Sequence, residues 1–176
     1  MRLTGRLGSA EVPMTTFKTD DLRADELADL EAKRAWVRDH FSDEKRGDYE
    51  KLAGKLKVLD VILGNGWVQP TETIKLQCLG VTFGDALAQE LGLTWIAIED
   101  ERGRDPGLVI PGTSIQLFPM TSISKRVERG ESVDVYELFG DALKTVARLR
   151  EEQANVAAET QQSAAADERP KASGRS

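Results

Sequence analysis

Residues 95–119 read WIAIEDERGRDPGLVIPGTSIQLFP, and this stretch decides the fold. It holds three segments rich in β-branched and aromatic residues, and we predict a strand for each: TWIAIE, GLVIP and TSIQLFP. The connections DERGRDP and PGT are too short for the crossovers that parallel strands require. The pattern therefore predicts a three-stranded antiparallel sheet. Both faces of the first strand are mostly apolar, which indicates that the sheet is covered, at least in part, on both sides.

The first connection gathers charged side chains, namely Glu99, Asp100, Glu101, Arg102, Arg104 and Asp105. Their carboxylates lack the spacing of an EF-hand loop, so the sequence predicts no metal site here. Gly103, Asp105, Pro106 and Gly107 are residue types that a hairpin connection favours. We interpret the segment as the tip of a β-hairpin. If the tip has a function, we expect protein recognition rather than catalysis, because loops on a rigid scaffold commonly carry binding residues.

The sequence before the sheet has helical periodicity. A first helix is predicted from Thr19 to about Phe41, with Asp20 or Asp21 as its cap. A second helix follows with Ser42 as its N-cap, and it ends at Gly64, Asn65 and Gly66, which tolerate the left-handed conformation. The short link between them predicts an antiparallel helical hairpin.

A third helix is predicted over residues 71–92, and its centre is apolar almost all round, as in a buried element. Gly80 and Gly84 lie four residues apart and share one helix face. Since glycine inside a helix costs about 1 kcal/mol relative to alanine, two on one face indicate close approach by another backbone. The alternative is an irregular helix that breaks near Gly80.

Two closing helices are predicted after the sheet. The first is capped by Thr121 or Ser122 and ends at Gly130, and the second begins at Asp134. The expected fold class is α+β: an N-terminal helical hairpin, a buried helix, a three-stranded antiparallel sheet and two C-terminal helices. We expect one domain at residues 19–150, between a disordered extension at 1–18 and a disordered tail at 151–176 that has too few large apolar side chains to pack. Met14 is an alternative start, so residues 1–13 are either a disordered extension or the result of a start assigned too early.

The composition argues against several functional classes. A net charge of −6 and a pI near 5.0 disfavour nucleic-acid binding and favour basic partners. Neither a signal peptide nor a membrane span can be recognised, so we expect a cytoplasmic protein without a membrane role. The single cysteine, Cys78, fits a reducing compartment and is interpreted as a buried helical residue. With one histidine, His40, at a helix end, common zinc sites and His-based nucleophilic catalysis are disfavoured.

The order of residues from Gly66 to about Leu143 resembles the bacterial domain of unknown function 3806. The features that carry the resemblance are Leu79-Gly80, Phe83-Gly84, Trp95, the turn at residues 100–103, Phe118-Pro119, Lys125-Arg126 and Gly130. The resemblance covers a little under half of the chain, and the helices at residues 19–64 lie outside it. It implies a small cytoplasmic bacterial α+β domain and supplies no catalytic residues.

Two functional hypotheses follow from the sequence. The first is a non-catalytic protein-binding module, of immunity or accessory type, which acts as a monomer or as a weak dimer through its helical hairpin. The alternative is a small-ligand binder or enzyme that uses the acidic tip and the helix of Lys125 and Arg126. No phosphate-loop or dinucleotide motif is present, so no cofactor is expected. The candidate binding residues are Asp100, Glu101, Arg102, Arg104, Asp105, Lys125 and Arg126, and the candidate structural residues are Gly80, Gly84, Trp95, Gly103, Pro119 and Gly130.

Overall fold

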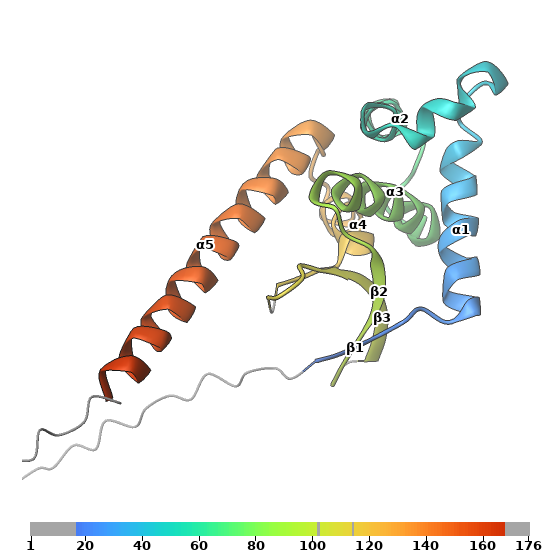
Figure 1. Ribbon diagram of the computed structural model, residues 1–176. Coiled ribbons are helices and arrows are strands. Elements are labelled where there is room, and N and C mark those ends of the chain that lie inside the picture. The colour runs from blue at the N-terminus through green and yellow to red at the C-terminus, as the bar shows by residue number, and fades with distance from the viewer. Residues whose placement is uncertain (1–16, 102, 114, 168–176) are drawn as a thin grey trace, which may run out of the picture.

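The fold is α+β, as the sequence predicted. The computed structural model describes residues 17–101, 103–113 and 115–167. Figure 1 shows helix α3 at the centre, with α1 and α2 on one side, the sheet below it, and α5 leading away on the other side. The elements in chain order are β1 (Lys18–Asp20), α1 (Ala24–Arg38), η1 (Asp43–Glu50), α2 (Leu52–Gly64), α3 (Thr73–Leu91), β2 (Trp95–Asp100), β3 (Gly103–Val109), β4 (Gln116–Leu117), η2 (Pro119–Thr121), α4 (Ser124–Glu128) and α5 (Val135–Asp167).

The sheet is an antiparallel meander in the order β1-β2-β3-β4. The three strands predicted from the sequence are present, and a fourth, β1, pairs with the free edge of β2, with Thr19 opposite Ile98. This corrects the expectation of a helix from Thr19. The three residues of β1 are exposed and have no apolar alternation, so only their pairing with β2 makes them a strand.

The hairpin tip is shorter than the sequence indicated. Asp100 pairs with Gly103, so residues 101 and 102 alone connect β2 to β3. Gly103, Asp105, Pro106 and Gly107 therefore lie within β3 rather than in the connection. A proline is tolerated there because β4 pairs only with Leu108 and Val109, which leaves the outer edge of β3 unpaired at Pro106.

Helix α3 is the centre of the core, because α1, α2, α4, α5 and η2 all pack against it. The close backbone approach predicted from its two glycines is confirmed at Gly80, whereas at Gly84 the approaching atoms belong to side chains. A Cβ at Gly80 would lie 2.3 Å from the carbonyl oxygen of Met120, and a Cβ at Gly84 would lie 2.3 Å from the ring of Trp95 and 2.9 Å from Pro119. The helix runs unbroken through both positions. The glycines thus let η2 and the Trp95 ring pack directly on the α3 backbone.

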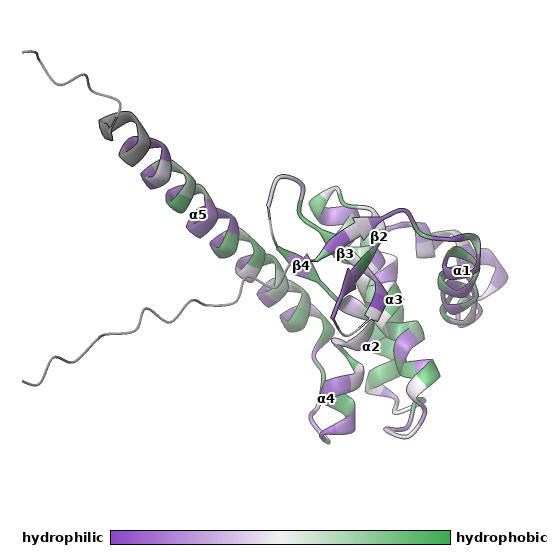
Figure 2. Ribbon diagram, turned by 90° about the horizontal axis from the view of Figure 1, so that it is seen from below, coloured by the Kyte–Doolittle hydropathy of each residue, from purple (hydrophilic) through white to green (hydrophobic). Residues whose placement is uncertain are grey.

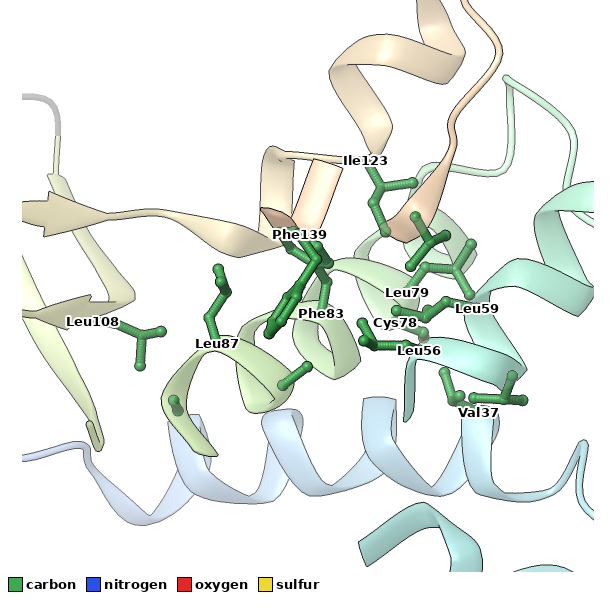
Figure 3. Packing of buried hydrophobic residues seen from close by; sticks show 14 of the residues in the cluster. Val37, Leu56, Leu59, Cys78, Leu79, Phe83, Leu87, Leu108, Ile123 and Phe139 are labelled. Carbon is green, nitrogen blue, oxygen red and sulfur yellow. The ribbon is translucent and has the colours of Figure 1, made fainter. Parts of the chain in front are cut away.

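The buried side chains form one continuous cluster around α3. Figure 3 shows Leu79, Phe83 and Leu87 of α3 between side chains of the sheet, the C-terminal helices and α2. Phe83 meets Phe139 of α5 edge to face, with ring centroids 6.3 Å apart. Leu108, fully buried on β3, extends the same cluster to the sheet.

The first two helical segments do not form the expected hairpin. The α1 and α2 helices each pack more extensively on α3 than on each other. The second predicted helix is also interrupted at Lys51, whose backbone is extended, so that η1 precedes α2. Here η1 folds back onto α2: a Cβ at Gly54 would lie 1.8 Å from the carbonyl oxygen of Asp48. The apolar repeat over residues 49–63 therefore arises from packing on α3 rather than from a helix pair.

Several helix ends differ from the prediction. The N-cap residue of α1 is Arg23, whose backbone N–H donates to Glu26 at 2.7 Å, so neither Asp20 nor Asp21 caps it. The hydroxyls of Thr121 and Ser122 donate to the carbonyl of Phe118, and α4 begins only at Ser124. The predicted ends at Asn65–Gly66, Gly92 and Gly130 are confirmed.

Helix α5 extends further than the composition indicated. Asp134 caps it as predicted, because its Oδ1 accepts the backbone N–H groups of Tyr136 and Glu137, both at 2.9 Å. The helix continues to Asp167, so residues 151–167 are helical where a disordered tail was expected. They project away from the domain (Figure 2). The expected disorder of residues 1–16 and 168–176 falls outside the described residues.

Candidate functional site

The hairpin separates the predicted binding residues onto two faces. In β2, Ile98 and Asp100 share one face, and in β3 this face holds Gly103 and Asp105, which pair with Asp100 and Ile98 respectively. Arg104 points to the opposite face. The charged residues that are close together in sequence therefore belong to different environments.

One face of the hairpin borders a pocket of about 300 Å³, which we call the tip pocket. It draws side chains from five elements or their flanks, so the topology gathers residues that are up to 48 positions apart in the sequence (Gln77 and Lys125). Its lining consists of Gln77, Ile98, Asp100, Gly103, Asp105, Pro106, Phe118, Met120, Thr121 and Lys125.

The floor of the tip pocket is apolar and its shape depends on glycine. Ile98 is 2% exposed and lies across Gly107, where an added Cβ would be 2.5 Å from Ile98 Cδ1. Phe118 is 38% exposed, so a large aromatic surface remains open at the wall. Met120 sits beside it because Gly80 lets the η2 backbone approach α3.

The rim of the tip pocket carries charges of opposite sign. Asp105 and Lys125 are both exposed, and within the described residues neither forms an ion pair. Asp100 adds a second carboxylate and is half-buried. The pocket therefore offers an apolar floor with two carboxylates and one ammonium group around it, which suits an amphipathic ligand carrying a charged group.

Arg104 is a structural residue on the opposite face of the hairpin. Its guanidinium donates to Glu26 at 2.8 and 3.2 Å and to the carbonyl of Asp21 at 2.9 Å, and it lies 3.4 Å from Asp20. These hydrogen bonds lower the pKa of Glu26, with the Arg104 side chain as the largest cause. They tie β3 to the segment before α1, which makes Arg104 unavailable to the tip pocket.

The other predicted binding residues are not gathered at the tip pocket. Glu101 is exposed at the turn, and Arg102 lies outside the described residues. Arg126 donates to the carbonyl of Ser122 at 2.7 Å and borders a separate depression with Phe83 and Leu138. The predicted structural residues Gly80, Gly84, Trp95 and Pro119 form the close α3 packing, while Gly103 and Gly130 have φ of 138° and 74°.

A second polar centre, which we call the Asp85 network, was not singled out from the sequence. Asp85 of α3 accepts two hydrogen bonds from Arg34 of α1, both at 2.8 Å, and one from the indole N–H of Trp95 at 2.8 Å. The buried Tyr49 hydroxyl donates to it at 3.2 Å and also contacts Thr82. Asp85 holds the pKa of Arg34 above its ordinary value through these hydrogen bonds. The network ties α1, η1 and β2 to α3.

The single histidine and cysteine are held by packing. His40 Nδ1 lies 2.9 Å from the carbonyl oxygen of Trp36, and its ring contacts those of Trp36 and Trp67. Cys78 is buried in α3, and burial raises the pKa of its thiol, which disfavours the reactive thiolate. In the described part of the chain, no three His, Cys, Asp or Glu side chains are gathered as a metal site would need.

The fold places the chain among small α+β domains in which helices pack around an antiparallel meander. Residues 55–139 match the family model described as Domain of unknown function (DUF3806), which confirms the family resemblance. The match runs from α2 into α5, so it includes the tip pocket and leaves α1 and η1 outside.

A solved structure has a related fold. A crystal structure from Bacteroides thetaiotaomicron VPI-5482 is 17% identical, with a TM-score of 0.56, over 77% of this chain and 51% of that chain. This chain thus spans about half the length of that protein, and the likeness concerns the fold alone. No curated protein matches the sequence significantly. Across the described residues, no helix is both long and apolar enough to cross a membrane.

Proposed function

We propose that the chain is a non-catalytic protein-binding module whose tip pocket holds a basic side chain of a partner. The observation that carries the proposal is the combination of an apolar floor at Ile98 and the exposed ring of Phe118 at the wall with the carboxylate of Asp105 at the rim. A lysine or arginine side chain has the matching form, because its aliphatic stem packs on apolar surface while its charged head remains at a polar rim. The net charge of −6 favours the approach of a basic partner.

The chemistry of the pocket supports binding rather than catalysis. His40 and Cys78, the residues most suited to nucleophilic or acid–base roles, both lie outside its lining. The polar groups at the rim can position a charged group by hydrogen bonds and charge. We also propose a cytoplasmic location, supported by the single free cysteine of the sequence.

Short blocked peptides test this proposal directly. Glycine-flanked lysine and arginine peptides would be titrated into ¹⁵N-labelled protein, with norleucine as the uncharged isostere of lysine. We expect the basic peptides to shift the backbone signals of Ile98, Asp105 and Phe118, and norleucine to bind more weakly. Asp105→Asn should weaken the basic peptides by about tenfold, since a charge-assisted hydrogen bond contributes about 1.5 kcal/mol or more.

Glu99→Gln is the matched control, because Glu99 is exposed on the opposite face of β2. It removes the same charge from the neighbouring strand of the same hairpin and should leave peptide binding unchanged. Equal affinity for lysine and norleucine peptides, or equal effects of the two substitutions, would show that the acidic rim does not select the ligand.

A second candidate is a small-ligand binder, favoured by the opposite charges of Asp105 and Lys125 around one pocket. A free amino acid could place its ammonium group at Asp105 and its carboxylate at Lys125. Lys125→Met distinguishes the candidates: it should abolish binding of free leucine or lysine while preserving binding of the blocked basic peptides. Preservation of free amino-acid binding in this variant would eliminate the second candidate.

A further inference from the structure

A cavity of about 420 Å³ opens where α1, η1, α2 and α3 meet, and we call it the cation pocket. Arg38, the last residue of α1, and Tyr49 of η1 line it together with Lys55 of α2 and Gln89 of α3. It shares no lining residue with the tip pocket. Any ligand bound here is therefore independent of the proposed peptide site.

Among the charged side chains that line the cation pocket, only the Lys55 ammonium and the Glu50 carboxylate take no part in a described ion pair. Asp85 is occupied by Arg34, and Glu31 lies 3.0 Å from Arg38 and 3.8 Å from Arg34. Lys55 has no carboxylate within ion-pair distance among the described residues. Its ammonium donates instead to two neutral oxygens, the backbone carbonyl oxygen of Glu50 at 3.2 Å and the side-chain Oε1 of Gln89 at 2.9 Å. Arg34 and Arg38 are thus paired, whereas the third carboxylate of the lining, Glu50, is exposed and lies beyond ion-pair distance of Lys55.

The unpaired ammonium of Lys55 is buried, which makes its charge costly without a counter-ion in direct contact. Lys55 is 6% exposed, and burial lowers the pKa of its ammonium group. Its third N–H bond has no acceptor among the described contacts. An anion in direct contact with Lys55 would supply the counter-ion that none of the described side chains provides.

A second unused donor lies in the same pocket. Arg38 Nε is buried and has no hydrogen-bond partner within the described chain. The guanidinium carbon of Arg38 and the Nζ of Lys55 lie 4.9 and 5.3 Å from the centre of the Tyr49 ring, which holds both cations at one aromatic side chain. Lys55 and Arg38 thus each have a buried donor without an acceptor, so a ligand that reaches them must supply acceptor oxygens.

We propose that the cation pocket binds the carboxylate of a small molecule between the Lys55 ammonium and the Arg38 guanidinium. A carboxylate supplies an acceptor oxygen to each donor, and its single charge pairs with the one ammonium group that has no carboxylate partner among the described residues. A phosphate dianion would overcompensate that charge in a pocket already bordered by Glu31 and Glu50. The volume accommodates a small ligand rather than a macromolecular surface.

The test uses the Arg38 Nε–H resonance of the full chain in ¹⁵N NMR spectra. Sodium acetate, sodium chloride and inorganic phosphate would be titrated at constant ionic strength. We expect a saturable shift of the Arg38 resonance with acetate, no saturable shift with chloride, and weaker binding of phosphate. Tighter binding of phosphate than of acetate would overturn the carboxylate assignment, and an identical response to chloride would show a non-specific ion effect.

Two variants connect the response to the pocket. Lys55→Gln should weaken acetate binding by about tenfold or more, since it removes a charged donor. Lys57→Gln is the matched control on the same helix, because Lys57 is exposed and pairs with Asp60 at 3.6 Å. Equal acetate affinity in Lys55→Gln and the wild type would refute the proposal.

A third variant remains informative if Lys55→Gln fails to fold. Gln89→Glu keeps Lys55 and places a carboxylate where the amide oxygen now lies 2.9 Å from its ammonium. This internal anion should pair with Lys55 and abolish the acetate response while preserving the circular dichroism spectrum. Undiminished acetate binding to Gln89→Glu would show that Lys55 does not hold the anion.

Discussion

Asp85→Ala tests whether the Asp85 network holds the helices around the sheet. The substitution removes the acceptor of both Arg34 hydrogen bonds and of the Trp95 indole N–H, and it creates no steric conflict. Breaking a buried ion pair costs about 3–5 kcal/mol, and the 20% residual exposure of Arg34 places this pair at the lower end. An unpaired indole N–H adds about 1 kcal/mol. We expect the free energy of unfolding to fall by roughly 3–4 kcal/mol.

Urea denaturation followed by circular dichroism measures this loss, and thermal denaturation should show a midpoint lower by roughly 6–16 °C. Asp141→Ala is the matched control, because Asp141 forms an exposed pair with Lys144 at 3.2 Å and should lose less than about 0.5 kcal/mol. Trp95→Phe keeps an aromatic ring and should lose about 1 kcal/mol. A loss below about 1 kcal/mol in Asp85→Ala would refute the assignment of the network as a structural anchor.

Three further predictions concern packing and pH dependence. Gly80→Ala should destabilise the fold by about 1–3 kcal/mol in thermal denaturation, because the added Cβ meets the backbone of Met120. Gly140→Ala has open space around the added Cβ and should stabilise α5 by up to about 1 kcal/mol in the same assay. Burial lowers the pKa of Lys55 in the folded chain. Between this lowered pKa and the ordinary pKa of lysine, the unfolded chain binds more protons than the folded chain, so the free energy of unfolding should rise with pH in this range. Lys55→Met should flatten that rise, as measured by urea titrations. Arg104 lowers the pKa of Glu26 in the folded chain. The stability that Glu26 contributes is therefore present above its ordinary pKa and is lost as pH falls through the pKa of the folded chain. Glu26→Gln should reduce the loss of stability at acid pH, and an unchanged loss would contradict the pairing.

Local sequence signals were sufficient for the centre of the fold. The strands around Trp95 and Leu108 carry β-branched and apolar residues that suit a covered sheet, and short connections leave only an antiparallel arrangement. Gly80 and Gly84 were informative because glycine in a helix is costly unless another element approaches. Each of these predictions rests on residues near one another in the chain.

The errors concern elements that depend on distant residues. β1 has no strand pattern of its own and is a strand only because it pairs with β2. The start of α1 is likewise held against β3 by the bond from Arg104 to Glu26, which lies 78 residues earlier. The helical hairpin was wrong because an apolar helix face does not reveal which surface it meets, and both α1 and α2 meet α3. The turn of the hairpin was predicted too long because glycine and proline, which are typical of turns, here lie within the edge of strand β3.

The candidate sites show the same division between local and long-range information. Part of the tip pocket was predicted from the sequence, because Asp105 and Lys125 were both candidate binding residues and both line it. Two other candidates, Arg104 and Arg126, face elsewhere. The cation pocket could not be found in this way. Its donors, Arg38 and Lys55, are ordinary surface-type residues in sequence, and only the fold buries Lys55 and the Nε of Arg38 beside Tyr49. The signal that reveals them is a buried ammonium without a carboxylate partner beside a buried Arg38 Nε without an acceptor, and recognising it requires the positions of all neighbouring side chains.

Both pockets are attached to the same rigid helix, and this limits how they can influence each other. Gln77 lines the tip pocket and Gln89 lines the cation pocket, and these two residues lie about 18 Å apart along α3. Between them, Gly80 and Gly84 hold η2 and Trp95 in direct contact with the helix backbone, so that a shift of α3 would require both contacts to move. Such packing favours two independently occupied sites over a coupled pair, because coupling needs an element with two alternative arrangements. Acetate at the cation pocket should accordingly leave the affinity of the tip pocket for a lysine peptide unchanged, and a reciprocal change in both affinities would show that α3 moves.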